Sequence, residues 1–190
     1  MDLKFFEEMT FEKEDFTQIS LSKGEYEYCI FKNCNFSNSD LADIKFLGCK
    51  FENCNLSMAK LLNTTFRDTE FNSCKMIGLQ FENCNNFLLS FSFNHCDLSY
   101  SSFYQNNIEK TKFINIKLHE ANFTECIMTG SIFENCDFAR AMFEQTNLER
   151  TDFSTSFNYA IDPAINRIKK ARFSMSGLIG LLSKYGIEVV

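Results

Sequence analysis

Nine cysteines and two histidines are the side chains of this 190-residue chain that could bind a metal, form disulfides or act as nucleophiles. Their spacing argues against each of these roles. No Cys-x-x-Cys pair occurs, and a zinc site needs clustered ligands at defined spacings. No Ser-His-Asp set, glycine-rich phosphate loop or pair of inward-facing carboxylates can be assembled around His95 or His119. We therefore expect no metal, no cofactor and no catalytic residue, and the chain is predicted not to be an enzyme.

The cysteines share a position in a five-residue period. Eight of the nine stand two residues before a large apolar residue, in a series that runs from Phe11 to Phe81 and again from Leu88 to Phe153. The ninth, Cys84, keeps the phase of the first series just before the slip. A period of five fits neither a helix nor a plain strand. It fits a backbone that turns a corner every five residues and points one large side chain inward each time. The cysteines then take a second, smaller inward position, where a thiol behaves as a small hydrophobe. Parallel Cβ directions along such a column make disulfide geometry poor.

A longer period gives the number of corners in each turn. The phrase Phe-x-Asn-Cys recurs, with variations, at Phe31, Phe51, Phe71, Phe93 and Phe133, and in degenerate form at Phe113. The intervals are 20 residues, except for one of 22 at a slip of two residues. Four pentapeptides per turn predict an all-β fold, a right-handed quadrilateral β-helix with a short C-terminal α-helix as its cap. About seven coils at the ~4.8 Å spacing of paired strands make a rod roughly 35 Å long. Asn33, Asn53, Asn115 and Asn135 would stack and hydrogen-bond from coil to coil.

The slip lies within residues 85–90. Phe87 and Leu89 flank the expected centre Leu88, so at least one of the two should face outward. The segment is either a bulge that closes over its own apolar side chains or a hydrophobic contact point for a partner. Both readings are left open by the sequence.

The two ends depart from the period. Residues 1–10 are predicted to form an N-terminal cap, residues 11–157 the β-helix, and residues 158–190 a C-terminal module. Ser174 or Ser176 as N-cap and Gly186 as the stop predict a helix over about 176–185. The last residues, 187–190, are typical of a short strand. We expect the module to join two chains into a homodimer, or to act as a cap alone, through the apolar residues Phe173, Leu178, Leu181, Leu182 and Tyr185.

The charge of the chain is uneven. The net charge of −6 argues against binding to nucleic acid or to an anionic membrane. No segment approaches a signal peptide or the ~20 apolar residues that span a bilayer, so we expect a cytoplasmic protein. One side of the rod should carry a partner-binding set of carboxylates against only Lys23 and Lys60; these are Asp40, Asp43, Glu82, Glu125 and Glu144. Duplex DNA of the same length carries roughly 20 charges, about three times as many as the rod. The acidic side therefore either imitates DNA through shape and modest charge or simply keeps the rod in solution.

The chain resembles the pentapeptide-repeat superfamily. Residues 121–125 (Ala-Asn-Phe-Thr-Glu) and 136–140 (Cys-Asp-Phe-Ala-Arg) match its pattern of a small residue, a polar residue and then Leu or Phe. The tail, with Asp162-Pro163, Ala-Arg-Phe-Ser, a short apolar helix and Ile/Val at the end, looks like the Qnr-type branch. The resemblance implies a homodimer that binds DNA gyrase and topoisomerase IV by imitating DNA and that reduces quinolone action.

An alternative function is a scaffold that binds another cytoplasmic protein. Its contacts would then be apolar side chains on the outside of the rod, namely Phe87, Leu89, Leu62, Tyr104 and Met142.

Overall fold

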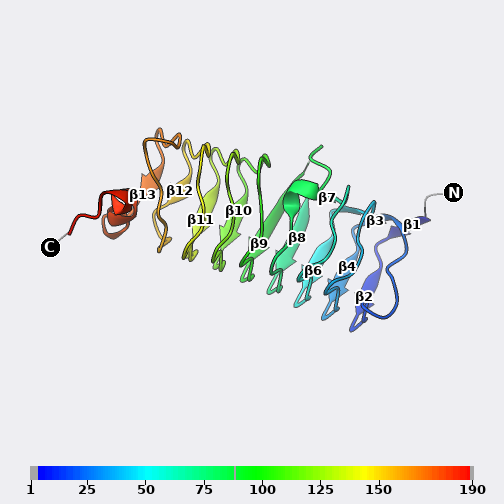
Figure 1. The fold of residues 1–190 in the computed structure, drawn as a ribbon. Coiled ribbons are helices and arrows are strands. Elements are labelled where there is room, and N and C mark those ends of the chain that lie inside the picture. Colours follow the sequence, from blue (N-terminus) through cyan, green and yellow to red (C-terminus); the bar gives the residue numbers. More distant parts are fainter. Residues whose placement is uncertain (1–3, 88, 189–190) are drawn as a thin grey trace.

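The chain winds into a rod of stacked coils. The computed structural model describes residues 4–87 and 89–188, which form a parallel β-solenoid of about 8 turns. Figure 1 shows the coils side by side, with the two ends of the chain at opposite ends of the rod. The predicted four-sided fold is confirmed.

Two of the four sides are β-sheets in which every pairing is parallel. The four-stranded sheet has the order β1-β3-β5-β7 and is formed by Lys4–Glu7, Gly24–Glu27, Lys45–Leu47 and Thr65–Arg67. The nine-stranded sheet has the order β13-β12-β11-β10-β9-β8-β6-β4-β2. In chain order its strands are β2 (Thr10–Glu12), β4 (Ile30–Lys32), β6 (Lys50–Glu52), β8 (Thr69–Asn72), β9 (Phe91–Asn94), β10 (Lys112–Ile114), β11 (Ile132–Glu134), β12 (Asp152–Phe153) and β13 (Arg172–Phe173). The other two sides are joined by single bridges, such as Asn35 with Asn55 and Asp40 with Lys60.

The core is a set of stacked files of large side chains. Phe31, Phe51 and Phe71 stand in one file, with ring centroids 4.7 and 5.0 Å apart and nearly parallel planes. The file continues across the slip, where Phe71 stacks on Phe93 at 5.3 Å. All four rings are buried, and burial of a phenylalanine contributes about 1.5–3 kcal/mol. The five-residue period is therefore a period of core positions.

Many side chains at the smaller inward position hydrogen-bond to the backbone of the preceding coil. The thiols of Cys54 and Cys74 donate to the carbonyl oxygens of Phe31 and Phe51 in the preceding coil, at 3.3 and 3.4 Å. The hydroxyl of Thr64 donates in the same way to its own preceding coil, at 2.8 Å. Cys, Ser and Thr therefore combine small size with a hydrogen bond to the preceding coil, although apolar residues such as Ala59 and Ile44 also fill this position without donating.

The rod is longer at both ends than the sequence predicts. Lys4–Glu7, expected within a cap, form β1, and Phe6 stacks on Tyr26 at 4.5 Å. At the other end the coil continues past residue 157 to β13, where Phe173 stacks on Phe153 at 5.5 Å. The reason is the same at both ends: Phe6 and Phe173 still fall on the five-residue period, and stacking on the next ring holds their segments in the coil.

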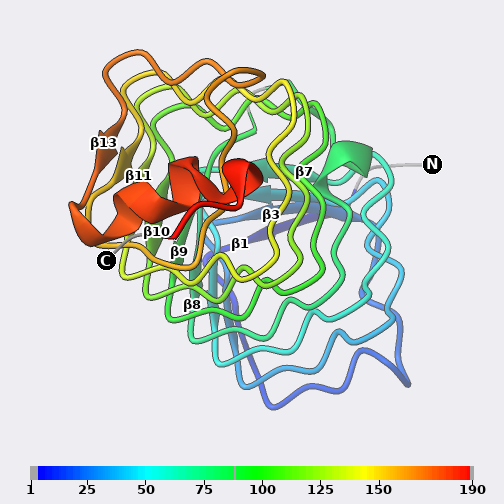
Figure 2. The same ribbon diagram turned by 60° about the vertical axis from the view of Figure 1, so that its left-hand side comes forward.

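The C-terminal helix differs in type from the prediction. In place of an α-helix, two 3₁₀ segments follow the last coil, η2 (Ser176–Leu181) and η3 (Ser183–Tyr185). Figure 2 shows them lying across the end of the rod. A Cβ atom on Gly180 would lie 2.2 Å from the carbonyl oxygen of Tyr159, so η2 packs directly against backbone. We attribute the tighter 3₁₀ winding to this close contact.

The predicted signals at the two ends of this helix have mixed outcomes. Ser174 acts near the start, where its Oγ accepts the amide of Gly177 at 3.0 Å. Gly186 ends the segment in the left-handed region, with φ of 59°. Ile187 and Glu188 form no strand, and Val189 and Val190 lie outside the described residues. Within the described ranges, neither 3₁₀ segment nor η1 (Phe81–Asn83) has the length and apolar character that a bilayer-spanning helix needs.

Candidate partner-binding surface

The corners of the coils point polar side chains outward in stacked rows. On the side whose inward centres run from Leu21 to Phe143, which we call the acidic side, corner residues adopt positive φ, 59° at Asp43 and 56° at Glu125. Asp and Asn tolerate this left-handed conformation better than most residues. Corner side chains of neighbouring coils also hydrogen-bond, since Asn63 Nδ2 donates to Asp43 Oδ1 at 2.8 Å.

Asp40 and Asp43 lie on the same coil of the acidic side, and both are exposed. The amide of Ala42 donates to Asp40 Oδ1 at 2.9 Å, and Lys23 Nζ lies 3.3 Å from the same oxygen. The hydrogen bond from Ala42, followed by the charge and hydrogen bond of Lys23, lowers the pKa of Asp40. Asp40 is therefore ionised but partly neutralised, whereas Asp43 accepts a hydrogen bond from the Asn63 amide and forms no ion pair with any described residue.

Glu82, Glu125 and Glu144 continue the acidic side on later coils. Glu82 is half-buried, and its Oε2 has no hydrogen-bond partner among the described residues. Glu125 accepts hydrogen bonds from Tyr104 at 3.3 Å and Gln105 at 2.8 Å. Its charge raises the pKa of the Tyr104 hydroxyl. The fold thus brings the five predicted carboxylates to one side, but it spreads them over several coils rather than into one cluster.

Pairing distinguishes the acidic side from the nine-stranded sheet. On that sheet, ion pairs join neighbouring coils: Lys50 Nζ lies 3.2 Å from Glu70, and Arg172 lies 2.8 Å from Asp152. On the acidic side, the described residues form one ion pair, between Lys23 and Asp40. Four carboxylates are left without a cationic partner within the described chain, namely Asp43, Glu82, Glu125 and Glu144. This difference in pairing could not be read from the charge count alone.

An apolar groove interrupts the row of carboxylates. It encloses about 550 Å³ and is lined by Met58, Leu62 and Gly78, together with Asn38, Ala59, Lys60, Leu61, Gln80 and Asn83. The side chains of Met58 and Leu62 are 58% and 65% exposed, so this part of the surface is apolar as well as accessible. Of the other proposed apolar contacts, Met142 is exposed and Tyr104 is half-buried.

The slip places its two predicted apolar residues differently. Phe87 is 76% exposed, whereas Leu89 is half-buried and packs against the core. Leu88, the predicted centre, lies outside the described residues. Phe91 takes the smaller inward position of the next coil and is buried there, in contact with Phe93 at 4.9 Å. The prediction that at least one flanking residue faces outward is therefore confirmed for Phe87.

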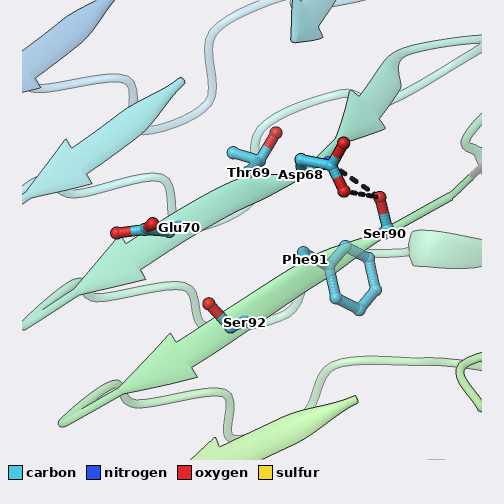
Figure 3. A pocket seen from close by; sticks show the side chains of 6 residues that line it. All are labelled: Asp68, Thr69, Glu70, Ser90, Phe91 and Ser92. Carbon is cyan, nitrogen blue, oxygen red and sulfur yellow. Dashed lines mark hydrogen bonds between the residues drawn. The ribbon is translucent and has the colours of Figure 1, made fainter. Parts of the chain in front are cut away.

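The extra residues also open a hollow between β8 and β9. Figure 3 shows its lining, which consists of Asp68, Thr69, Glu70, Ser90, Phe91 and Ser92. The hydroxyl of Ser90 donates to Asp68 Oδ1 at 3.0 Å and accepts a hydrogen bond from the amide of Asp68 at 2.7 Å.

The slip also ends the four-stranded sheet. The last strand of that sheet is β7, one coil before the slip, and beyond the slip the same side of the rod is joined by single bridges.

The apolar residues predicted at the C-terminus divide between core and surface. Phe173 and Leu181 pack against the core. Leu178 and Leu182 remain 40% and 38% exposed, and Tyr185 is 61% exposed. Ile179, at 54% exposure, belongs to the same surface and was missed, because a helix of 3.6 residues per turn places it off the predicted stripe.

The nine cysteines lie in the core, and the two histidines lie on the outside of the rod in separate rows. All nine cysteines are buried and unbridged, and burial raises the pKa of Cys136 to about 12. His119 Nε2 lies 2.8 Å from Asp137 on the neighbouring coil, whereas His95 lies in the asparagine row, 3.2 Å from Asn115 Nδ2. Within the described ranges, no three His, Cys, Asp or Glu side chains gather as metal ligands would.

Comparison with known proteins agrees with this geometry. A family model described as "Pentapeptide repeat region" matches residues 24–91 and 86–157. Full-length QnrB1, a plasmid-mediated fluoroquinolone resistance protein, is 19% identical, with a TM-score of 0.57, over 97% of this chain and 100% of that one. HetL, a pentapeptide repeat protein involved in heterocyst differentiation regulation in the cyanobacterium Nostoc sp. strain PCC 7120, is 15% identical, with a TM-score of 0.73, over 91% and 87%. No curated protein sequence was found to match the chain.

Proposed function

Because the chain belongs to the pentapeptide-repeat family, we propose that it is a non-enzymatic binding protein whose acidic side occupies a DNA-binding surface of DNA gyrase or topoisomerase IV in the cytoplasm. The observation that carries this proposal is the set of carboxylates on that side that have no cationic partner within the described chain. Unpaired surface carboxylates attract a basic groove, whereas carboxylates already paired with lysine do not.

The shape of the rod supports the same proposal. Parallel strands stack about 4.8 Å apart, so about 8 coils give a straight rod of roughly 35–40 Å. DNA of that length carries roughly 20 charges or more, well above the charge of the acidic side. The fit of the rod to a DNA-binding groove of the topoisomerase would therefore depend on shape as well as charge. QnrB1, a plasmid-mediated fluoroquinolone resistance protein, is similar in fold and suggests the drug class to test.

The test is gyrase supercoiling in the presence of ciprofloxacin with increasing amounts of the purified protein. We expect the protein to restore supercoiling that the drug has inhibited. Bovine serum albumin at equal mass serves as the control for non-specific protection. If supercoiling stays inhibited at every concentration and the protein does not bind gyrase, the proposed function is wrong.

Dimer formation through the C-terminus is a second part of the proposal. Ile179, Leu182 and Tyr185 form an exposed apolar surface at the end of the rod, next to Phe157, which is 47% exposed. Burial of this surface against a second copy would stabilise a dimer through the hydrophobic effect. Sedimentation of the intact chain should give a dimer, and the variant Ile179→Asp/Leu182→Asp should give a monomer. A monomeric intact chain would leave these segments as a cap alone.

A scaffold function with another cytoplasmic partner is favoured by one specific feature, the exposure of Phe87 and Leu62. Large exposed apolar side chains mark protein contacts when they gather in a patch. Loss of partner binding in Phe87→Ser, with gyrase binding absent from the wild-type chain, would favour this function over the first.

A further inference from the structure

A row of cations follows one corner of the C-terminal half of the rod. Four successive coils place Lys110, Gly130, Arg150 and Lys170 at equivalent corner positions, so a glycine separates the first cation from the other two. All four adopt left-handed φ, from 56° to 70°. The corners are held directly above one another by the backbone, since the amide of Arg150 donates to the carbonyl oxygen of Lys169 at 3.0 Å.

Two more cations flank this row. Lys112 begins β10 and Lys169 precedes Lys170, and both are exposed. We call the five residues Lys110, Lys112, Arg150, Lys169 and Lys170 the cationic corner. None of them forms an ion pair within the described chain. The carboxylates nearby are Glu109, Glu149 and Asp152, and the last two are already held by Arg167 and Arg172, at 2.9 and 2.8 Å.

Like charges in neighbouring coils are the exception in this rod. Elsewhere, several residues 20 apart pair opposite charges, as Lys45 does with Glu25 at 3.1 Å and Lys32 with Glu52 at 3.5 Å. At the cationic corner, Arg150 lies one coil from Lys170, with no carboxylate between them in the row. Like charges directly opposite each other destabilise paired strands. An external anion would remove that repulsion.

We propose that the cationic corner binds the phosphodiester backbone of DNA. At ~4.8 Å per coil, the row from Lys110 to Lys170 spans roughly 15 Å. A DNA strand carries one phosphate per 3.4 Å of axis, so about four phosphates face a row of this length. Gly130 has no side chain, and a Cβ atom there would touch only Lys110 Cγ, at 3.8 Å. The gap leaves room for the DNA backbone to approach the cationic corner.

The net charge of −6 led to the expectation that nucleic acid is not bound. That expectation averages over the whole chain, whereas the acidic side and the cationic corner lie on separate parts of the surface. The cationic corner adjoins the nine-stranded sheet and not the acidic side. A protein partner and DNA could therefore be contacted at the same time. The proposal goes beyond the proposed function and does not depend on it.

The experiment measures binding of the full chain to a fluorescent 20-base-pair duplex by anisotropy, in the absence of any topoisomerase. The corner variant is Lys110→Gln/Arg150→Gln/Lys170→Gln. The matched control is Lys60→Gln/Arg67→Gln/Lys75→Gln, which removes the same charge from three cations that also lack ion pairs in the described chain. We expect binding at about 25 mM salt, with a log–log salt slope of about −2 to −4, near −0.9 for each phosphate contacted. The corner variant should lose at least about tenfold in affinity and the control less than about threefold.

Three results would overturn the proposal. The first is no binding of the wild-type chain at low salt, and the second is equal loss in the two triple variants. The third is displacement of DNA by polyaspartate at equal charge concentration, because the corner would then attract any anionic chain. Thermal melting of each variant shows whether the fold is retained. Since no topoisomerase is present, failure here leaves the proposed function untouched.

Discussion

The phenyl rings of Phe51 and Phe71 lie face to face, with centroids 5.0 Å apart and planes 20° apart, although 20 residues of chain separate them. Phe71 also has a ring on its other side, Phe93 at 5.3 Å. Phe11, at the N-terminal end of the same file, stacks on Phe31 alone and is only partly buried. The stability contributed by a ring should therefore depend on its place in the file.

Phe71→Ala should lower the free energy of unfolding by about 3–5 kcal/mol, because it leaves a cavity between two buried rings. Phe11→Ala should lower the free energy of unfolding markedly less, because no described coil covers the outer face of that ring. Urea denaturation measures both. Equal losses for the two variants would show that the coils do not contribute as a stack of neighbours.

The slip offers a second matched pair. Phe87→Ala should change the free energy of unfolding by less than about 0.5 kcal/mol, because the side chain is exposed. Phe91→Ala, four residues later, should cost about 3 kcal/mol or more, since this buried ring fills a position that cysteine occupies in other coils. A large loss in Phe87→Ala would mean that this ring packs into the coil.

The buried thiols predict how stability depends on pH. Burial raises the pKa of Cys49 and Cys136 to about 12, whereas thiols of the unfolded chain ionise near 8.5. These groups favour the folded state below the unfolded pKa, and that advantage is lost as pH rises from about 8.5 toward 12. The free energy of unfolding, measured under reducing conditions, should be flat from pH 7 to 8 and fall above pH 9. In the variant Cys49→Ala/Cys136→Ala, the free energy of unfolding should fall less steeply with pH. An unchanged slope would show that these two thiols do not cause the pH dependence.

Substitution of Gly180 tests the effect of close packing, and substitution of Gly130 tests the effect of backbone conformation. An added Cβ on Gly180 would lie 2.2 Å from Tyr159 O, whereas on Gly130 its nearest neighbour is 3.8 Å away and only the φ of 70° is unfavourable. Gly180→Ala should loosen η2 and η3 and speed cleavage by trypsin at Lys184, while Gly130→Ala should leave that rate unchanged. Equal cleavage rates in the Gly180→Ala variant and the wild-type chain would mean that the segment does not depend on this contact.

The sequence predicts the core of this protein better than its surface. The period from Phe11 to Phe153 places nearly every inward side chain, because each core position is set by a local five-residue rule. It does not predict that Phe91 fills a small position beside the slip, since the added residues change the local register. Nor does it predict that Leu181 turns inward while Ile179 stays exposed, because we attribute the 3₁₀ winding to a close contact between Gly180 and Tyr159 that lies outside local sequence rules.

Pairing of surface charges is the part that sequence could not supply. The count of residues places five carboxylates on one side, but only the structure separates Asp40, which is paired with Lys23, from Asp43, which is not. The same holds for Arg150 and Arg167, of which only the second has a carboxylate at 2.9 Å. Long side chains reach across coils, so their partners depend on three-dimensional distances.

The most direct test of the account is the affinity of purified gyrase for three forms of the chain. These are the wild type, the acidic-side variant Asp43→Asn/Glu125→Gln/Glu144→Gln, and the control Glu27→Gln/Glu109→Gln/Glu134→Gln, whose carboxylates lie off the acidic side and are unpaired in the described chain. We predict that the acidic-side variant binds at least about tenfold more weakly than the wild type, and the control within about threefold. Equal affinity of the acidic-side variant and the wild type, or no binding by the wild type, would contradict the account.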